Sequence, residues 1–191
     1  ALLVTSLIAA FPALGAQQTY TLKSRHYEIV TDLDRGAIRD IASHMDAVAA
    51  EYERVLSGFP VKNSMRNRLY VFRDRASYLA FMGEFGFNAA NTGGVFFVRE
   101  GQSGLATWTE ARARSRMYHV LQHEGFHQFA DARIGRELPT WANEGLAEYF
   151  GQALIVRGTL RTGLVPGARL EQLKRAIRNE ETFPFTELVL M

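Results

Sequence analysis

The sequence contains no cysteine. This absence excludes disulfide bonds, iron–sulfur clusters, thiol catalysis and zinc sites built on cysteine thiolates. Any metal that this chain binds must therefore be held by histidine, aspartate or glutamate side chains.

The chain also lacks a strong excess of either charge, with 22 basic and 20 acidic residues and a net charge of +2. Such a balance gives no electrostatic footprint for nucleic acid, and we expect no nucleic-acid partner. The nearest approach to a basic cluster is Arg112, Arg114 and Arg116. We interpret these three arginines as the solvated side of a helix.

Long hydrophobic runs are absent too. The uncharged stretch at residues 1–16 is too short for a membrane span. It ends in small residues, and Ala13 and Gly15 fit the rule for cleavage after Gly15, so it resembles part of a secretory signal peptide. We therefore expect an exported protein, periplasmic or extracellular, with no stable membrane span after signal removal; the alternative is a buried N-terminal helix. The apolar run at residues 185–191 indicates a possible C-terminal truncation of the domain at 17–191.

With 191 residues, of which 47% are hydrophobic, the chain fits one globular domain. Neither an internal repeat nor an interdomain linker is evident. Alternating and helical hydrophobic patterns predict an α+β fold, with a small, mostly antiparallel sheet packed with helices. The expected strands are 20–22, 26–31, 68–72, 95–98 and 105–108, with a small hairpin at 156–165, and the expected helices are 38–55, 77–85, 109–131, 141–154 and 168–179.

The most informative stretch is the H-E-x-x-H pattern of His123, Glu124 and His127. Side chains four residues apart lie on one face of a helix, so the two imidazoles can point at one metal ion. Glu124 is about 100° round the helix from His123 at 3.6 residues per turn, close enough to reach water at that ion as a general base. The alternative interpretation is two surface histidines with a solvated glutamate between them.

A second predicted helix carries Glu144 and Glu148, again four residues apart and therefore on one face. If it packs beside the first helix, one carboxylate can coordinate the metal and the other can meet the N–H of a zinc-bound histidine. Gly145 costs about 1 kcal/mol in a helix relative to alanine, which suggests a close approach of another backbone. Otherwise both glutamates are solvated helix surface.

These two helices together resemble the gluzincins, the thermolysin-like class of zinc peptidases, and more narrowly a group of often secreted bacterial peptidase-MA-like domains. The motifs that carry the resemblance are His123-Glu124-x-x-His127 and Pro139-x-Trp141-x-Asn143-Glu144-Gly145-Leu146-Ala147-Glu148-Tyr149.

The resemblance implies a zincin-like fold and one Zn²⁺ ion held by His123, His127 and Glu144. It implies that Glu148 supports the first histidine, with Asn143 beside the ligands, and that Glu124 is the general base in the hydrolysis of a peptide or protein substrate. By the same analogy, residues 105–108 would be the edge strand that lines the cleft.

Other candidates are less well placed. Gluzincins usually supply a tyrosine or histidine that stabilises the oxyanion, and here Tyr118 and Tyr149 are candidates without geometric support. Asp131 follows His127 by four residues and is a candidate partner for it. His119 would lie about 12 Å along the helix axis from His127, too far to share its ion, and is interpreted as a supporting or surface residue. His26 and His44 are interpreted as surface or ordinary structural residues.

Two alternative functions remain open at this point. The first is a binding module that keeps the peptidase-like fold but no longer hydrolyses a substrate. This function would explain why no oxyanion donor can be assigned. A zinc hydrolase acting on a non-protein amide or ester would use the same residues on another substrate.

Overall fold

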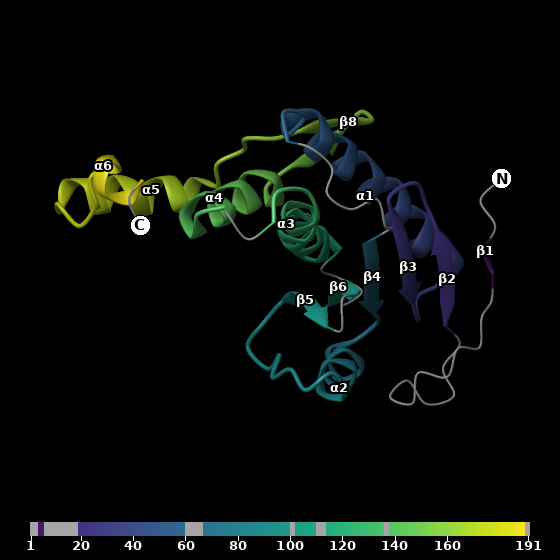
Figure 1. Cartoon of the computed structure of the whole chain (residues 1–191). Helices are drawn as coiled ribbons and strands as arrows, with labels where there is room; N and C mark the ends of the chain where they lie inside the picture. Colours follow the sequence, from purple (N-terminus) through teal and green to yellow (C-terminus); the bar gives the residue numbers. More distant parts are fainter. Residues whose placement is uncertain are drawn as a thin grey trace.

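The computed structural model describes residues 4–5, 19–59, 67–99, 102–109, 114–135 and 138–189. The fold is α+β: a mixed sheet with helices on both faces (Figure 1). The predicted signal segment lies outside the described residues except for Val4–Thr5, which form the short strand β1. Arg112 also lies outside them, whereas Arg114 and Arg116 are exposed.

Six strands form the main sheet in the order β1-β2-β3-β4-β6-β5. After β1, they are β2 (Tyr20–Lys23), β3 (Tyr27–Thr31), β4 (Asn67–Phe72), β5 (Gly94–Arg99) and β6 (Gln102–Trp108). The pairs β3–β4 and β4–β6 are parallel, and the other pairs are antiparallel. The sheet is thus mixed: three of its five strand pairs are antiparallel, and the prediction of a mostly antiparallel sheet missed the two parallel pairs. The reason is that a helix crosses the sheet between β3 and β4 and returns the chain in the same direction.

That crossing helix is α1 (Arg35–Val55). Its N-cap is Asp34, whose carboxylate accepts hydrogen bonds from the backbone N–H groups of Gly36 and Ala37 at 2.8 and 2.9 Å. The helix expected at 38–55 presents an apolar face to the core, with Ile38, Ile41, Met45, Val48 and Tyr52 buried.

Two further helices lie on opposite faces of the sheet (Figure 1). Helix α3 (Arg114–Arg133), which carries the H-E-x-x-H motif, packs with α1 over Leu69 and Leu105. Helix α2 (Arg75–Glu84) covers the other face through an aromatic cluster that includes Tyr70 and Phe97.

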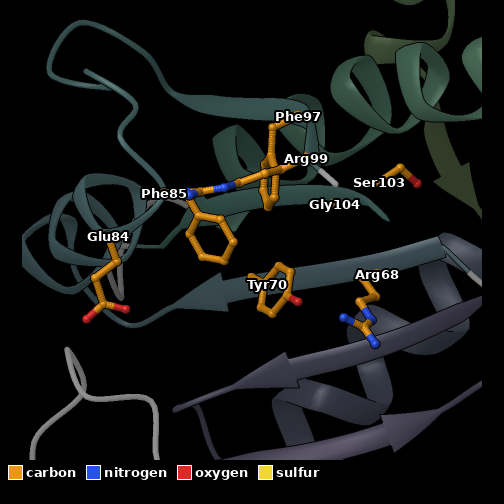
Figure 2. A pocket seen from close by; sticks show the side chains of 8 residues that line it. All are labelled: Arg68, Tyr70, Glu84, Phe85, Phe97, Arg99, Ser103 and Gly104. Carbon is orange, nitrogen blue, oxygen red and sulfur yellow. The ribbon is translucent and has the colours of Figure 1, made fainter. Parts of the chain in front are cut away.

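A hollow of about 360 Å³ lies on the α2 face and includes Tyr70, Phe85 and Phe97 among its lining residues (Figure 2). The Phe97 ring lies over Gly104 of β6, where a Cβ would stand 2.5 Å from it. The hollow therefore opens on the side of the sheet away from the histidine motif.

Helix α4 (Thr140–Gly151) follows α3 and packs against it through Phe150, which stacks on Phe126 with ring centroids 5.3 Å apart. A separate hairpin of β7 (Leu154–Val156) and β8 (Thr159–Arg161) leads to α5 (Gly167–Arg178) and α6 (Phe185–Leu188). The helix expected at 168–179 is present as α5, and its apolar side chains Leu170, Leu173 and Ile177 are exposed. Within the described residues, no helix is both long and apolar enough to cross a bilayer.

Candidate metal centre

The histidine motif is positioned by the close packing of α3 against α1. Gly125 lies on the buried side of α3, and a Cβ there would stand 3.1 Å from Cε of Met45. The hydroxyl of Tyr52 donates a hydrogen bond of 2.5 Å to the main-chain oxygen of Gln122. This packing fixes the rotation of α3, so His123 and His127 lie on its side toward α4.

Helices α3 and α4 bring His123, His127 and Glu144 together. The two Nε2 atoms are 3.2 Å apart, and each lies 3.5 Å from an oxygen of Glu144. Ligand atoms held about 2.0–2.1 Å from a tetrahedral zinc would stand roughly 3.3 Å from one another, which agrees with these spacings. The Glu144 side chain is 55% exposed, whereas those of the histidines are 17% and 13% exposed, so the cluster opens to solvent on the Glu144 side.

His123 points its other ring nitrogen at Glu148, with Nδ1 to Oε1 at 3.6 Å. This Nδ1 is buried and lies beyond hydrogen-bond distance of any partner in the described part of the chain. Burial lowers the pKa of His123, and the neighbouring His127 lowers it further, against the opposing charges of Glu148 and Glu144. The neutral imidazole, which is the form that binds metals, is therefore favoured.

His127 is oriented by Asn143 of α4, since its Nδ1 lies 3.1 Å from the side-chain oxygen of Asn143. An amide oxygen can only accept, so this contact requires the N–H on Nδ1 and leaves Nε2 with its lone pair facing the cluster. The sequence had suggested Asp131 as the partner of His127, but the residue that contacts its Nδ1 is Asn143.

Glu124 lies near the middle of α3, and its side chain reaches the edge of the sheet. Its Oε2 accepts a hydrogen bond of 3.1 Å from the backbone N–H of Phe96 on β5. Burial raises the pKa of Glu124, while the hydrogen bond from Phe96 opposes that rise. A carboxyl group with a raised pKa is a better proton acceptor than an ordinary one, which is the property that a general base requires.

The strand beside Glu124 is therefore β5, and the expectation for residues 105–108 was wrong. Strand β6 lies inside the sheet between β4 and β5. The hairpin folds so that β6 pairs in parallel with β4, which leaves β5 at the edge.

Helix α4 is held against α3 at its C-terminal end. The side-chain amide of the buried Gln122 donates to the main-chain oxygens of Phe150 and Ala153 at 3.2 and 2.9 Å. Gly151 lies directly against α3, because a Cβ there would be 3.3 Å from the His123 Cβ. Gly145, by contrast, has nothing within 4 Å of a Cβ, so the predicted close approach at Gly145 was wrong and occurs at Gly151.

The remaining histidines have structural contacts away from the three ligand atoms. Nδ1 of His119 lies 2.8 Å from the main-chain oxygen of Gly151, tying α3 to α4. His26 contacts Asp46 and Glu53 at 3.2 and 3.5 Å. His44 stacks on Tyr118 with ring centroids 4.1 Å apart, and burial lowers the pKa of His44 to about 4.

Neither tyrosine proposed as an oxyanion donor has its contacts in the cluster. Tyr118 packs on His44 and on the core between α1 and α3. The Tyr149 hydroxyl is 2.8 Å from Oγ1 of Thr162, in the segment after β8.

Three groups that support the metal centre could not be predicted from the sequence. The Phe96 N–H is a backbone group, and Gln122 is a single polar residue within an apolar face. Arg169 of α5 makes two contacts with Glu148, at 2.8 and 2.9 Å, although 21 residues separate them. Only the tertiary arrangement reveals these three.

The cluster fits a zinc ion in donor chemistry as well as in spacing. Two imidazole nitrogens and one carboxylate oxygen form the ligand set of hydrolytic zinc sites that keep one position open. In the part of the chain that the structure describes, His123, His127 and Glu144 are the group of metal-binding side chains whose ligand atoms all lie within 4.8 Å of one another. No protein-family model matches the sequence, and the search of curated proteins finds no significant match.

Proposed function

We propose that this protein is a zinc metallopeptidase with a zincin-like fold. The observation that carries the proposal is the convergence of His123, His127 and Glu144 at spacings of 3.2–3.5 Å. Glu124 is near enough for the charges of His127 and Glu144 to act on it. The resemblance of the two motif helices to those of gluzincins supports the same function. The buried Nδ1 of His123 and the Asn143 contact of His127 both favour imidazoles whose Nε2 atoms are free to bind metal.

When bound, zinc would polarise the carbonyl of the scissile bond and lower the pKa of water. The residues of this chain perform the proton transfers. Glu124, buried and with a raised pKa, takes a proton from the attacking water. The protonated Glu124 then delivers it to the leaving amine. Because the Phe96 N–H donates to its Oε2, the carboxylate is held at the edge strand.

Metal content and peptide turnover of the purified chain test this function together. We expect about one zinc ion per chain and hydrolysis of peptides in a mixed library. The double variant His123→Ala/His127→Ala should lose both properties, whereas His26→Ala, a histidine held by Asp46 and Glu53, should keep both. A folded wild-type chain that takes up no zinc would refute the proposal.

The competing function is a zinc-binding module without turnover. It is favoured by the Tyr149 hydroxyl, which bonds to Thr162 instead of facing the cluster. In that case about one zinc ion per chain would still bind, but no peptide and no non-protein amide or ester would be hydrolysed. Glu124→Gln would then leave binding of the biological partner unchanged. The export of the chain remains a prediction of the sequence.

A further inference from the structure

Glu148 joins the candidate metal centre to helix α5. One of its oxygens, Oε2, lies 2.8 Å from Nη1 of Arg169, and the other, Oε1, lies 2.9 Å from Nη2. The same Oε1 is the oxygen that lies 3.6 Å from Nδ1 of His123. The Arg169 guanidinium, the carboxylate and the imidazole therefore form a continuous row from α5 to the cluster.

The two parallel contacts fix the orientation of the carboxylate. A glutamate side chain has several rotamers on a helix surface, and a planar guanidinium that binds both oxygens selects one of them. Here the selected rotamer directs Oε1 at the buried Nδ1 of His123. The Arg169 guanidinium contacts both oxygens, and such a two-point contact favours the ionised carboxylate.

The Glu148 carboxylate lies 3.6 Å from Nδ1, beyond hydrogen-bond distance, and its negative charge favours the tautomer that carries the proton on that nitrogen. The N–H then resides on Nδ1, and Nε2 presents its lone pair to His127 and Glu144. The contribution of this contact to overall stability is expected to be small, because the Arg169 side chain is 54% exposed. Helix α5 has no buried residue, so this pair is a polar tie between that helix and the centre.

We propose that Arg169 is a positioning residue of the metal centre, acting through Glu148 on the orientation and tautomer of His123. The proposal rests on the proposed zinc binding by His123, His127 and Glu144. It adds a residue of α5, outside both motif helices, to the set that prepares the site for metal.

The first test is zinc affinity, measured by competition with a chromophoric chelator. We expect Arg169→Gln to weaken zinc binding about tenfold, and Glu148→Gln by up to about 100-fold, the range for loss of a group that orients a ligand. The double variant should bind like Glu148→Gln alone, because Arg169 acts only through that carboxylate. Arg169→Lys, which restores the charge at one contact point, should recover part of the loss.

The matched control is Lys174→Gln. Lys174 lies on the same helix and pairs with Glu171 at 2.8 Å, with both side chains about half exposed. This variant removes a cation and an ion pair from α5 without touching Glu148, so its zinc affinity should equal that of the wild type. Equal losses in Lys174→Gln and Arg169→Gln would assign the effect to charge or helix stability and overturn the proposal.

The second test uses the metal-free protein. Nitrogen-15 NMR of labelled histidines, at a pH where His123 is neutral, reports which ring nitrogen carries the proton. We expect the Nδ1–H tautomer at His123 in the wild type and in Lys174→Gln, and a mixture of tautomers in Arg169→Gln. A wild-type tautomer population in Arg169→Gln would overturn the proposal. Absence of zinc binding by the wild type would instead refute the proposed function, while the tautomer comparison would still decide the role of Arg169.

Discussion

The backbone N–H of Phe96, on the edge strand β5, donates a hydrogen bond to the carboxylate of Glu124 on α3, with a distance of 3.1 Å. The contact couples the glutamate of the histidine motif to the sheet instead of to the other motif helix. Glu124 is therefore held by the sheet, whereas Glu144 reaches the cluster from α4. Changing each of these two glutamates to glutamine should therefore have a different effect on turnover and on zinc affinity.

Glu124→Gln should keep both the fold and the metal. No ligand is lost, and the amide oxygen can still accept from the Phe96 N–H. Turnover should fall by about 10²–10⁴, the usual effect of losing a general base. Zinc content and peptide hydrolysis measured on the same preparation check this. Loss of the metal with Glu124→Gln would contradict the assignment of Glu124 as base and not ligand.

Glu144→Gln should weaken zinc binding itself, because a neutral amide replaces the anionic ligand that lies 3.5 Å from both Nε2 atoms. Chelator competition gives the affinity. Glu171→Gln serves as control, because Glu171 pairs with Lys174 of the same helix within the described part of the chain. Retention of wild-type affinity and turnover by Glu144→Gln would show that the third ligand had been assigned wrongly.

Asn143→Ala should lower zinc affinity by roughly 10–100-fold, since His127 then loses the acceptor for its Nδ1–H. Asn143→Asp supplies an acceptor in the same place and should restore most of the affinity. Isothermal titration of the two variants separates loss of the acceptor from loss of the side chain. Equal affinities in Asn143→Ala and the wild type would mean that the contact does not orient His127.

Local patterns were enough to predict the elements that contain the site. The helices expected at 38–55 and 141–154, which are α1 and α4, follow from rules that act over a few residues. The order of strands in the sheet does not follow from such local rules, because strand pairing depends on which way the chain crosses the sheet. The same hairpin of β5 and β6 could have placed either strand at the edge, and the edge strand was accordingly predicted wrongly.

Spacing also limits what can be said of the site. His123 and His127, or Glu144 and Glu148, can be placed on one helix face because a helix repeats regularly. The contact of Asn143 with His127 depends on the distance between two helices, which no single helix pattern encodes. Gly145 and Gly151 illustrate the limit: both lie on α4, and only the tertiary packing distinguishes the open position from the crowded one.

His44 should make the metal-free protein less stable in acid. Burial lowers its pKa from 6.5 to about 4, so protonation favours the unfolded chain. The stability due to the neutral ring is complete above pH 6.5 and is lost as the pH falls from 6.5 through about 4. At about 1.4 kcal/mol per pKa unit, the loss is roughly 3 kcal/mol.

Urea unfolding in the presence of a chelator, between neutral pH and the folded-state pKa of His44, measures this dependence. His44→Gln should flatten the curve of unfolding free energy against pH, whereas His26→Gln removes a histidine that faces Asp46 and Glu53 and serves as control. A His44→Gln curve with the same slope as the wild type would contradict the prediction.

Alanine substitutions at the two glycines of α4 should have effects of opposite sign. Gly145→Ala adds a methyl group to open space and should stabilise the protein by about 0.5–1 kcal/mol, because alanine loses less backbone entropy in a helix. At Gly151 the methyl would lie 3.3 Å from both His119 Cε1 and His123 Cβ. The His119 ring cannot move aside freely, since its Nδ1 contacts the Gly151 oxygen at 2.8 Å. Overpacking of this kind costs about 1–3 kcal/mol and should exceed the entropic gain.

Because relief of this overpacking would push α4 away from α3, Gly151→Ala should also weaken zinc binding by separating Glu144 from the histidines. Unfolding free energies and zinc affinities of the two variants measure both effects, and stabilisation by both alanines would mean that α4 does not approach His123 as closely as Gly151 requires.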